Sequence, residues 1–212
     1  MLSGAQPKRS LGVILGTGPS LAGSAEQVRE LGRCGALLFG CNNTFQDFDL
    51  DVWLACDPTW HKHYGQVAGD FDKWHWSTEI CTKYNYTYIE GVWHDGLWMQ
   101  DASKISLNHC SGAQLLNLAC NQYQCGTVLL VGHDFTYREG EPRHYFVDLS
   151  DQCGEYPPNL RKFSLFDKKG QGDDLLAVYK RIAATPGLPE IINCTPNSAL
   201  PWFPMGNLCE FM

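Results

Sequence analysis

The sequence predicts an α/β fold, a Rossmann-like three-layer sandwich with a mostly parallel sheet and a lid region. Short continuous apolar runs, typical of buried parallel strands, alternate with stretches whose apolar residues recur at helical spacing. Such alternation indicates βαβ units, in which helices cover both faces of a parallel sheet. Polar residues or glycines follow several of the runs directly, and ligands bind at those strand ends in sheets of this kind.

Six apolar runs are the candidate strands, of which the fifth is the clearest and the fourth the weakest. They cover residues 11–15, 36–41, 52–56, 87–91, 127–132 and 190–194. Apolar residues at helical spacing predict helices over 21–31, 111–124 and 173–184. Pro58 is suited to begin a further helix after the third strand.

The chain of 212 residues is long enough to bury a sizeable core as one domain. Residues 1–10 are predicted to be a disordered lead, and residues 11–212 to form a single Rossmann-like domain. The segment 138–172 is long and only weakly periodic, which indicates a lid or substrate loop.

Composition excludes several classes of protein. Hydrophobic residues make up 44% of the chain and aromatic residues 12%, which is too many for a disordered chain. The formal net charge of −7 argues against general nucleic-acid binding, because neutralising phosphates needs clustered cations. The longest apolar runs fall far short of the ~20 residues of a membrane helix, so no membrane span is predicted.

The cysteines indicate a reducing compartment. All ten are scattered along the chain without a CxxC pair, and several lie in or beside apolar runs, as buried reduced thiols do. The first residues place two cations before a short apolar stretch, which does not resemble a signal peptide. The expected location is therefore the cytoplasm.

The first candidate site follows the first strand, where a glycine-rich turn leads into a helix. Its residues are Gly16, Thr17, Gly18, Pro19 and Ser20. Such a turn can present free backbone N–H groups to a nucleotide phosphate. The turn matches neither GxGxxG nor a P-loop, so an ordinary tight βα turn remains the alternative.

Two further strand ends carry polar side chains. Asn42 and Asn43 follow the second strand, where their amides can hold a ribose or a base edge or form an ordinary turn. Asp57 follows the third strand and can bind a metal or a hydroxyl, or cap the helix that Pro58 begins.

A second group of candidates surrounds the clearest strand. Ser111 and Gly112 open a helix before it, and the residues Gly132, His133, Asp134 and Tyr137 follow it. Asp134 can orient a sugar, hold a cation, act as a base or simply hold loop N–H groups. His144 and Tyr145 lie in the predicted lid, where a histidine can serve as general base.

The seven histidines do not predict a metal site. His61 and His63 have HxH spacing, but the segment after Pro58 is predicted to be helical, where side chains two residues apart diverge. Neither HExxH nor a His pair four residues apart is present. No metal ligands are therefore predicted from the histidines.

Taken together, the motifs resemble a known family. GxGPSL, a strand ending in CNN, Ser-Gly opening a helix, VGHDFTY and CTPNSALPWF occur in the order seen in bacterial CMP-sialic-acid-dependent sialyltransferases. The chain is also similar to the related domain of motility accessory factors and 6-hydroxymethylpterin diphosphokinases. The resemblance spans roughly residues 11–205 and implies a Rossmann-like sheet that binds a nucleotide-linked donor.

The resemblance also implies roles for residues. The donor phosphate would be held by the turn residues Gly16, Gly18, Pro19 and Ser20, and the ribose or base by Asn42. The donor would also face Ser111 and Gly112. The departing phosphate would be contacted by Tyr137 and Tyr145. The sialyltransferases carry a catalytic histidine just before the last amphipathic helix, and residues 166–172 contain none here. His144 or Asp167 would then act as the base.

Three functions follow as expectations. The first is a glycosyltransferase with a CMP-activated, sialic-acid-like donor and a small-molecule or glycan acceptor, which needs no cofactor. The second is a Mg²⁺-dependent diphosphokinase acting with ATP on a hydroxymethylpterin-like alcohol, with Asp57 and Asp134 as metal ligands. The third is a nucleotide-binding protein without turnover.

The apolar residues of the tail either form a homo-oligomer contact or cover the sheet. They are Trp202, Phe203, Leu208 and Phe211.

Overall fold

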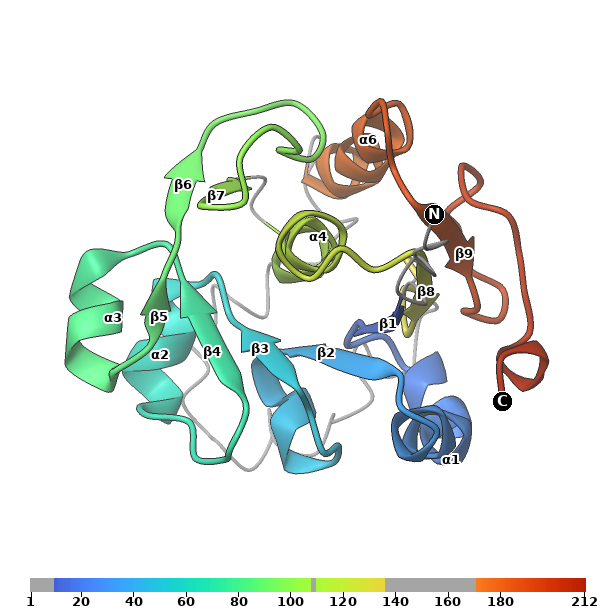
Figure 1. The fold of residues 1–212 in the computed structure, drawn as a ribbon, viewed down its shortest axis with the longest axis horizontal. Coiled ribbons are helices and arrows are strands. Elements are labelled where there is room, and N and C mark those ends of the chain that lie inside the picture. Colours follow the sequence, from blue (N-terminus) through green and yellow to red (C-terminus); the bar gives the residue numbers. More distant parts are fainter. Residues whose placement is uncertain (1–9, 108–109, 136–170) are drawn as a thin grey trace, which may run out of the picture.

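The structure is a computed structural model that describes residues 10–107, 110–135 and 171–212 (Figure 1). Its centre is a seven-stranded sheet in the order β5-β4-β3-β2-β1-β8-β9, and every neighbouring pair is parallel. The strands are β1 (Leu11–Leu15), β2 (Leu37–Cys41), β3 (Val52–Leu54), β4 (Asp72–His75), β5 (Thr87–Tyr88), β8 (Thr127–Val131) and β9 (Glu190–Asn193). The predicted α/β class is confirmed.

The order of the strands reverses at β1. From there the chain adds β2 to β5 on one side, and later adds β8 and β9 on the other. In the register of the β1–β8 pair, Leu15 lies opposite Val131, so both strands end at the same level. The topological switch point, where ligands bind in open α/β sheets, therefore lies between the ends of β1 and β8.

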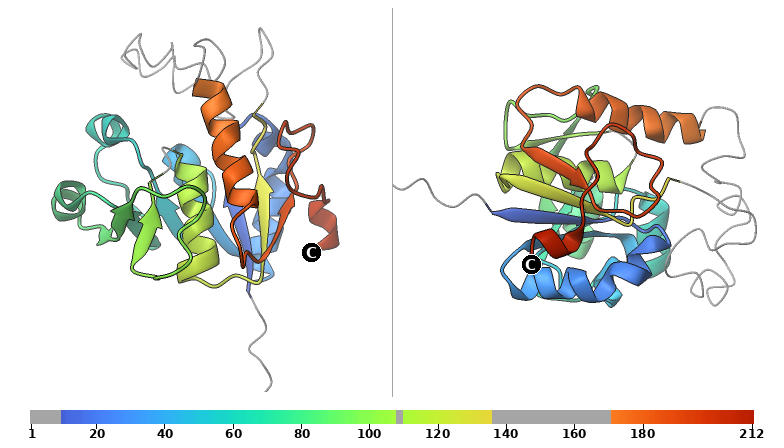
Figure 2. Two further views of the ribbon diagram at one scale, coloured as in Figure 1. Left: turned by 90° about the horizontal axis from the view of Figure 1, so that it is seen from above. Right: turned by 90° about the vertical axis from the view of Figure 1, so that its right-hand side faces the viewer.

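Helices cover both faces of the sheet (Figure 2). Their bounds are α1 (Ser20–Arg33), α2 (Pro58–Tyr64), α3 (Thr78–Tyr84), α4 (Ser111–Asn117) and α6 (Gln171–Ala183). α1 lies on one face, while α4 and α6 lie on the other. α4 continues without a break into a π-helical turn, η2 (Leu118–Gln122), and short 3-10 turns are η1 (Asn42–Gln46) and η3 (Leu208–Glu210).

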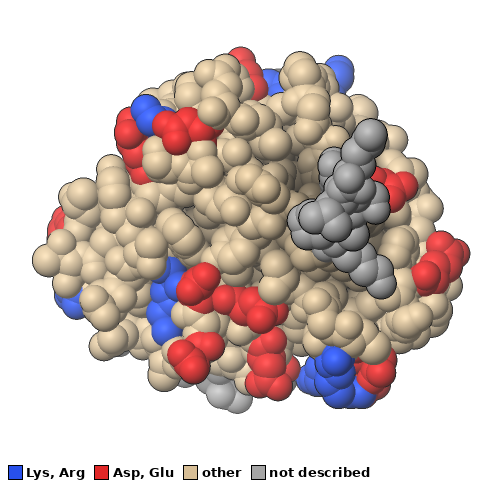
Figure 3. Space-filling view, viewed as in Figure 1, with Lys and Arg blue, Asp and Glu red and all other residues tan. Residues whose placement is uncertain are grey.

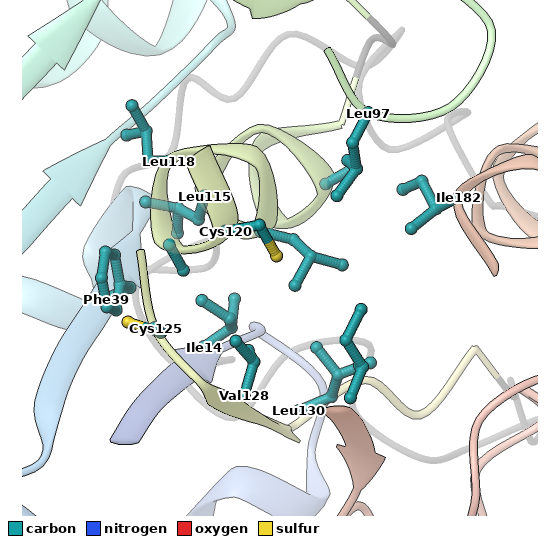
Figure 4. Close-up of a cluster of buried hydrophobic side chains, with 14 of the residues drawn as sticks. Ile14, Phe39, Leu97, Leu115, Leu118, Cys120, Cys125, Val128, Leu130 and Ile182 are labelled. Carbon is teal, nitrogen blue, oxygen red and sulfur yellow. The ribbon is translucent and has the colours of Figure 1, made fainter. Parts of the chain in front are cut away.

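The period-two pattern of the strands divides the core into two halves. Val13 and Leu15 pack with α1, whereas Ile14 packs with α4 and α6 on the other face (Figure 4). All three side chains are fully buried, as is expected for the central strand of a parallel sheet.

Three elements were not predicted from the sequence. They are β4, α3 and β7 (Lys104–Ser106). The candidate strand 87–91 is two strands in different sheets, because β5 joins the main sheet and β6 (Glu90–Val92) pairs with β7 in a two-stranded sheet. The predicted lid, 138–172, lies outside the described residues except for its last two positions, which belong to α6.

The C-terminal tail packs on the body of the chain. Phe203 and Leu208 are buried, one in each half of the core, and Trp202 and Phe211 are partly buried against the same clusters. These side chains therefore pack on their own chain, and a homo-oligomer contact stays a prediction.

Charged side chains on the surface are mixed in sign, and the cysteines are not paired within the described residues. On the face drawn in Figure 3, Lys and Arg lie in small groups, mostly beside Asp or Glu, and form no continuous basic stripe among the described residues. The nine cysteines within the described ranges are free thiols. Within those ranges, no helix has the length and apolar character needed to cross a membrane.

Candidate functional site

The glycine-rich turn after β1 is joined to the loop after β8. The N–H of Gly16 donates to the carbonyl of Val131 at 2.8 Å, and the N–H of Gly18 to that of Gly132 at 2.9 Å. A side chain on Gly16 would overlap the Gly132 carbonyl oxygen, and Gly132 itself has a φ of 72°, which favours glycine. The two loops can therefore meet only because glycine stands at these positions.

Asp134 extends this connection to the start of α1. Its carboxylate accepts a hydrogen bond from the Ser20 hydroxyl at 2.8 Å and another from the Ser20 N–H at 3.3 Å. The side chain is 9% exposed, and burial raises the pKa of this carboxyl, while its bonds to Ser20 act in the opposite direction. Asp134 thus places an internal anion at the N-terminus of α1, where the helix dipole favours one.

This geometry differs from the expectation of free N–H groups in the turn. The N–H groups of Gly16, Gly18 and Ser20 are all hydrogen-bonded within the protein, and Pro19 has none. The turn is therefore closed by β8 and Asp134 rather than open as a phosphate cradle. Thr17 is half-buried in the same turn.

The loop after β8 is held from behind by the C-terminal tail. The N–H of His133 donates to Thr195 Oγ1 at 3.0 Å, and the Ser198 hydroxyl donates to the His133 carbonyl at 2.6 Å. The N–H of Ala199 donates to the Asp134 carbonyl at 2.9 Å. The CTPNSALPWF segment therefore fixes the backbone that carries His133 and Asp134.

The imidazole of His133 is 4% exposed and faces α4. Its Nδ1 lies 3.1 Å from the carbonyl of Val131, and its Nε2 has no hydrogen-bond partner among the described residues. Burial lowers the pKa of this imidazole to about 4, so the ring is neutral at physiological pH. A side chain on Gly112 would lie 3.0 Å from this Nε2, which places His133 against the first turn of α4.

The start of α4 is tied to the end of β3. The Ser111 hydroxyl accepts a hydrogen bond from the Cys56 N–H at 3.0 Å and donates to the Cys56 sulfur at 3.1 Å. Burial raises the pKa of the Cys56 thiol to about 12, so this sulfur stays protonated and is a poor nucleophile. The residue that precedes α4, Cys110, makes no side-chain capping hydrogen bond.

The two asparagines after β2 have different surroundings. Asn43 is buried, and its amide oxygen accepts a hydrogen bond from the Trp60 indole at 2.9 Å. Asn42 is half-buried with a left-handed φ of 49°, and its carbonyl accepts a hydrogen bond from the Trp53 indole at 2.8 Å. The Asn42 side-chain amide makes no hydrogen bond to the described residues, so Asn42 is the member of the pair available to a ligand.

The remaining predicted residues are placed as follows. Asp57 is half-buried just before α2, and its carbonyl accepts a hydrogen bond from the Trp60 N–H at 3.1 Å. Tyr137, His144, Tyr145 and Asp167 lie outside the described residues. Within the ranges that the structure describes, no group of three or more His, Cys, Asp or Glu side chains is placed to hold a metal ion.

Sequence reasoning missed three side chains that shape the site. Thr195 and Ser198 fix the backbone of His133, and Tyr179 of α6 lies fully buried beside its ring, with centroids 5.7 Å apart. The polar TPNS segment directly after β9 was a usable signal for the first two. Tyr179 gave no such signal, because its position fits the apolar face of an amphipathic helix.

Comparison with known proteins adds no relative. No family model matches the chain, and neither the curated proteins nor the solved structures contain a match.

Proposed function

We propose that this protein is a nucleotide-dependent transferase, and specifically a glycosyltransferase with a CMP-activated, sialic-acid-like donor. The observation that carries the proposal is the linked set of polar groups at the switch point of the sheet. Ser20 and Asp134 are hydrogen-bonded across the ends of β1 and β8, and Gly112 of α4 packs against His133 beside them. Small-molecule ligands bind at this place in open parallel sheets.

The surroundings of each strand end suggest where a nucleotide would lie. The partner-free amide of Asn42, at the end of β2, is the proposed contact for the ribose or base. The start of α1 already holds the Asp134 carboxylate, and a second anion there would be repelled. We therefore propose that the donor phosphate lies at the start of α4, near Ser111, rather than at the start of α1.

Glycosyl transfer is favoured over diphosphoryl transfer by the state of Asp134. Diphosphoryl transfer depends on Mg²⁺ held by carboxylates. Both oxygens of Asp134 already accept hydrogen bonds from Ser20, and metal coordination would have to compete with them. A CMP-linked donor reacts without such a metal.

In the proposed reaction an acceptor oxygen forms a bond to the anomeric carbon of the donor sugar. The bond from that carbon to the phosphate oxygen breaks, and CMP leaves with the electron pair. His144 or Asp167 is the proposed base for the acceptor proton, and Tyr137 and Tyr145 are the proposed contacts of the departing phosphate.

Thermal melting of the full chain against CMP, UDP, GDP and ATP, each with Mg²⁺ and with EDTA, tests the proposal. A nucleotide at 100 times its Kd adds about 2.7 kcal/mol, which raises the Tm by roughly 5–10 °C for a chain of this size. Stabilisation by CMP that persists in EDTA is the expected result. Stabilisation by ATP only with Mg²⁺ would favour the diphosphokinase, and no shift with any nucleotide would refute a nucleotide site.

A further inference from the structure

Trp93 is the most exposed large apolar side chain among the described residues. Its exposed fraction is 72%, against 59% for Met205 and 49% for Tyr88. Single exposed apolar side chains are common on protein surfaces, and what distinguishes Trp93 is the backbone that carries it.

The backbone on both sides of Trp93 is held by β7 and the residue after it. The N–H of Leu107 donates to the Val92 carbonyl at 2.8 Å, and the Ser106 hydroxyl donates to the His94 carbonyl at 2.9 Å. Trp93 is therefore presented on a fixed backbone. A rigid aromatic side chain loses little conformational freedom when a ligand packs against it, which makes it an effective binding contact.

The chain after Trp93 is anchored to α6. Asp95 forms an ion pair with Arg181 Nε at 3.2 Å, and the Leu97 N–H donates to Thr185 Oγ1 at 3.1 Å. The Leu97 side chain is buried in the core cluster that α4 and α6 share (Figure 4). The exposed segment that carries Trp93 is therefore short and fixed at both ends.

Trp93 lies near the start of α4. It directly follows β6, and β6 and β7 end at the same level, because Val92 lies opposite Ser106. Leu107 and Ser111 are four positions apart, which is at most ~14 Å of chain. A substrate that extends from the proposed phosphate position near Ser111 can therefore reach Trp93.

The neighbours of Trp93 favour a saccharide as its partner. The exposed side chains beside it along the chain are those of Glu90, which pairs with Lys104 at 3.2 Å, and of His94 and Asp95. Contacts that dominate protein interfaces lie instead at the centre of desolvated patches, within rings of packed residues. A sugar ring has an apolar C–H face that can pack on an aromatic ring, and hydroxyls that can bond to polar side chains around it.

We propose that Trp93 is a stacking contact for a saccharide, and that this saccharide is the acceptor of the proposed transferase. The indole packs against the apolar face of a sugar ring, while polar neighbours such as His94 and Asp95 bond to its hydroxyls. The proposal rests on the proposed function for one point, the role of the sugar as acceptor.

Saturation-transfer difference NMR on the full chain tests the contact. Galactose, lactose and N-acetylglucosamine are the probes, and saturable transfer from the protein to at least one of them is expected. Trp93→Ala should weaken that binding about tenfold or more, and Trp93→Phe, which keeps an aromatic ring, should retain most of it. Because Trp93 is exposed, both variants should keep a Tm within roughly 2 °C of the wild type, so a loss of binding is not a loss of fold.

Met205→Ala is the matched control. Met205 is also exposed, but it lies beside β9, away from β6 (Figure 1), and alanine there should leave sugar binding unchanged. Absence of transfer to all three sugars, or equal binding by wild type and Trp93→Ala, would overturn the proposal. It is also overturned if light scattering shows a wild-type dimer that Trp93→Ala dissociates, because the indole then belongs to an interface between copies. Failure of CMP to shift the melting curve would refute the nucleotide site alone, since the sugar titration is made without nucleotide.

Discussion

The Asp134 carboxylate accepts hydrogen bonds from both the hydroxyl and the backbone N–H of Ser20, at 2.8 Å and 3.3 Å, and so joins the end of β8 to the start of α1. This relationship fixes the two loops that flank the switch point of the sheet. It also places the Asp134 carboxyl at the N-terminus of α1, which is why we propose the start of α4 for the ligand phosphate.

Gly18→Ala tests the closeness of the two loops. A Cβ at position 18 would overlap Asp134 Oδ2, so the carboxylate must move, and we expect a loss of about 1–3 kcal/mol in the free energy of unfolding. Gly23→Ala is the matched control, because its Cβ would meet nothing within 4 Å. Alanine there should stabilise α1 by roughly 0.5–1 kcal/mol. Equal effects in urea unfolding would contradict the described contact.

Asp134→Asn tests the buried carboxylate through pH. Burial raises the pKa of Asp134 in the folded state, so the stability it contributes is complete below the unfolded pKa and is lost as pH rises through the folded pKa. Urea unfolding between pH 3 and 7 should therefore show that the free energy of unfolding of the wild type falls relative to that of the variant as pH rises. Asp49→Asn, at an exposed position, is the control. A constant difference between wild type and Asp134→Asn would contradict the raised pKa.

Buried histidines predict a loss of stability in acid. Burial lowers the pKa of both His75 and His133 to about 4, below the unfolded value of about 6.5. The unfolded chain therefore binds more protons between these values, and the free energy of unfolding should fall as pH drops from 6.5 to 4. His75→Phe should reduce this slope, as measured by urea unfolding across that range. An unchanged slope would show that His75 does not titrate on unfolding.

Asn117 is expected to be the main polar support of the β6–β7 region. Its amide oxygen accepts hydrogen bonds from the N–H groups of Trp98 and Ser106, at 2.9 Å and 3.0 Å, and its amide nitrogen donates to the Trp98 carbonyl at 2.8 Å. Asn117→Ala should cost roughly 2–4 kcal/mol, because it leaves buried backbone groups unpaired. Asn121→Ala, which loses one bond at an exposed position, should cost much less in the same unfolding assay. Similar losses would contradict the supporting role.

The sequence predicted the strands that form the centre of the sheet, because their long apolar runs are a strong local signal. It missed β4, whose sequence is DKWH, because this strand is exposed at its first position and only half-buried at the next two. It missed β7 and the division of 87–91 for a related reason, since strands of two or three residues are shaped by their neighbours more than by their own pattern.

For the site, the sequence could predict which strand ends carry polar residues but not how those residues use their hydrogen bonds. Asn42 and Asn43 look equivalent in sequence, yet Trp60 satisfies only Asn43. Likewise, Asp134 and Ser20 were each singled out, but their direct bond depends on the β1–β8 pairing over 114 residues of separation. Tertiary partners of this kind cannot be read from local spacing.

The most direct test of the account is calorimetric titration of the full chain with CMP in EDTA, for wild type, Asn42→Gly and Asn85→Gly. Both asparagines have left-handed backbones, with φ of 49° and 58°, so glycine keeps each conformation while removing the amide. Asn85 lies at the end of α3 and serves as the control. We predict CMP binding that Asn42→Gly weakens by about tenfold, as for one lost hydrogen bond, and that Asn85→Gly leaves unchanged. Absence of CMP binding, or equal binding by all three proteins, would contradict it.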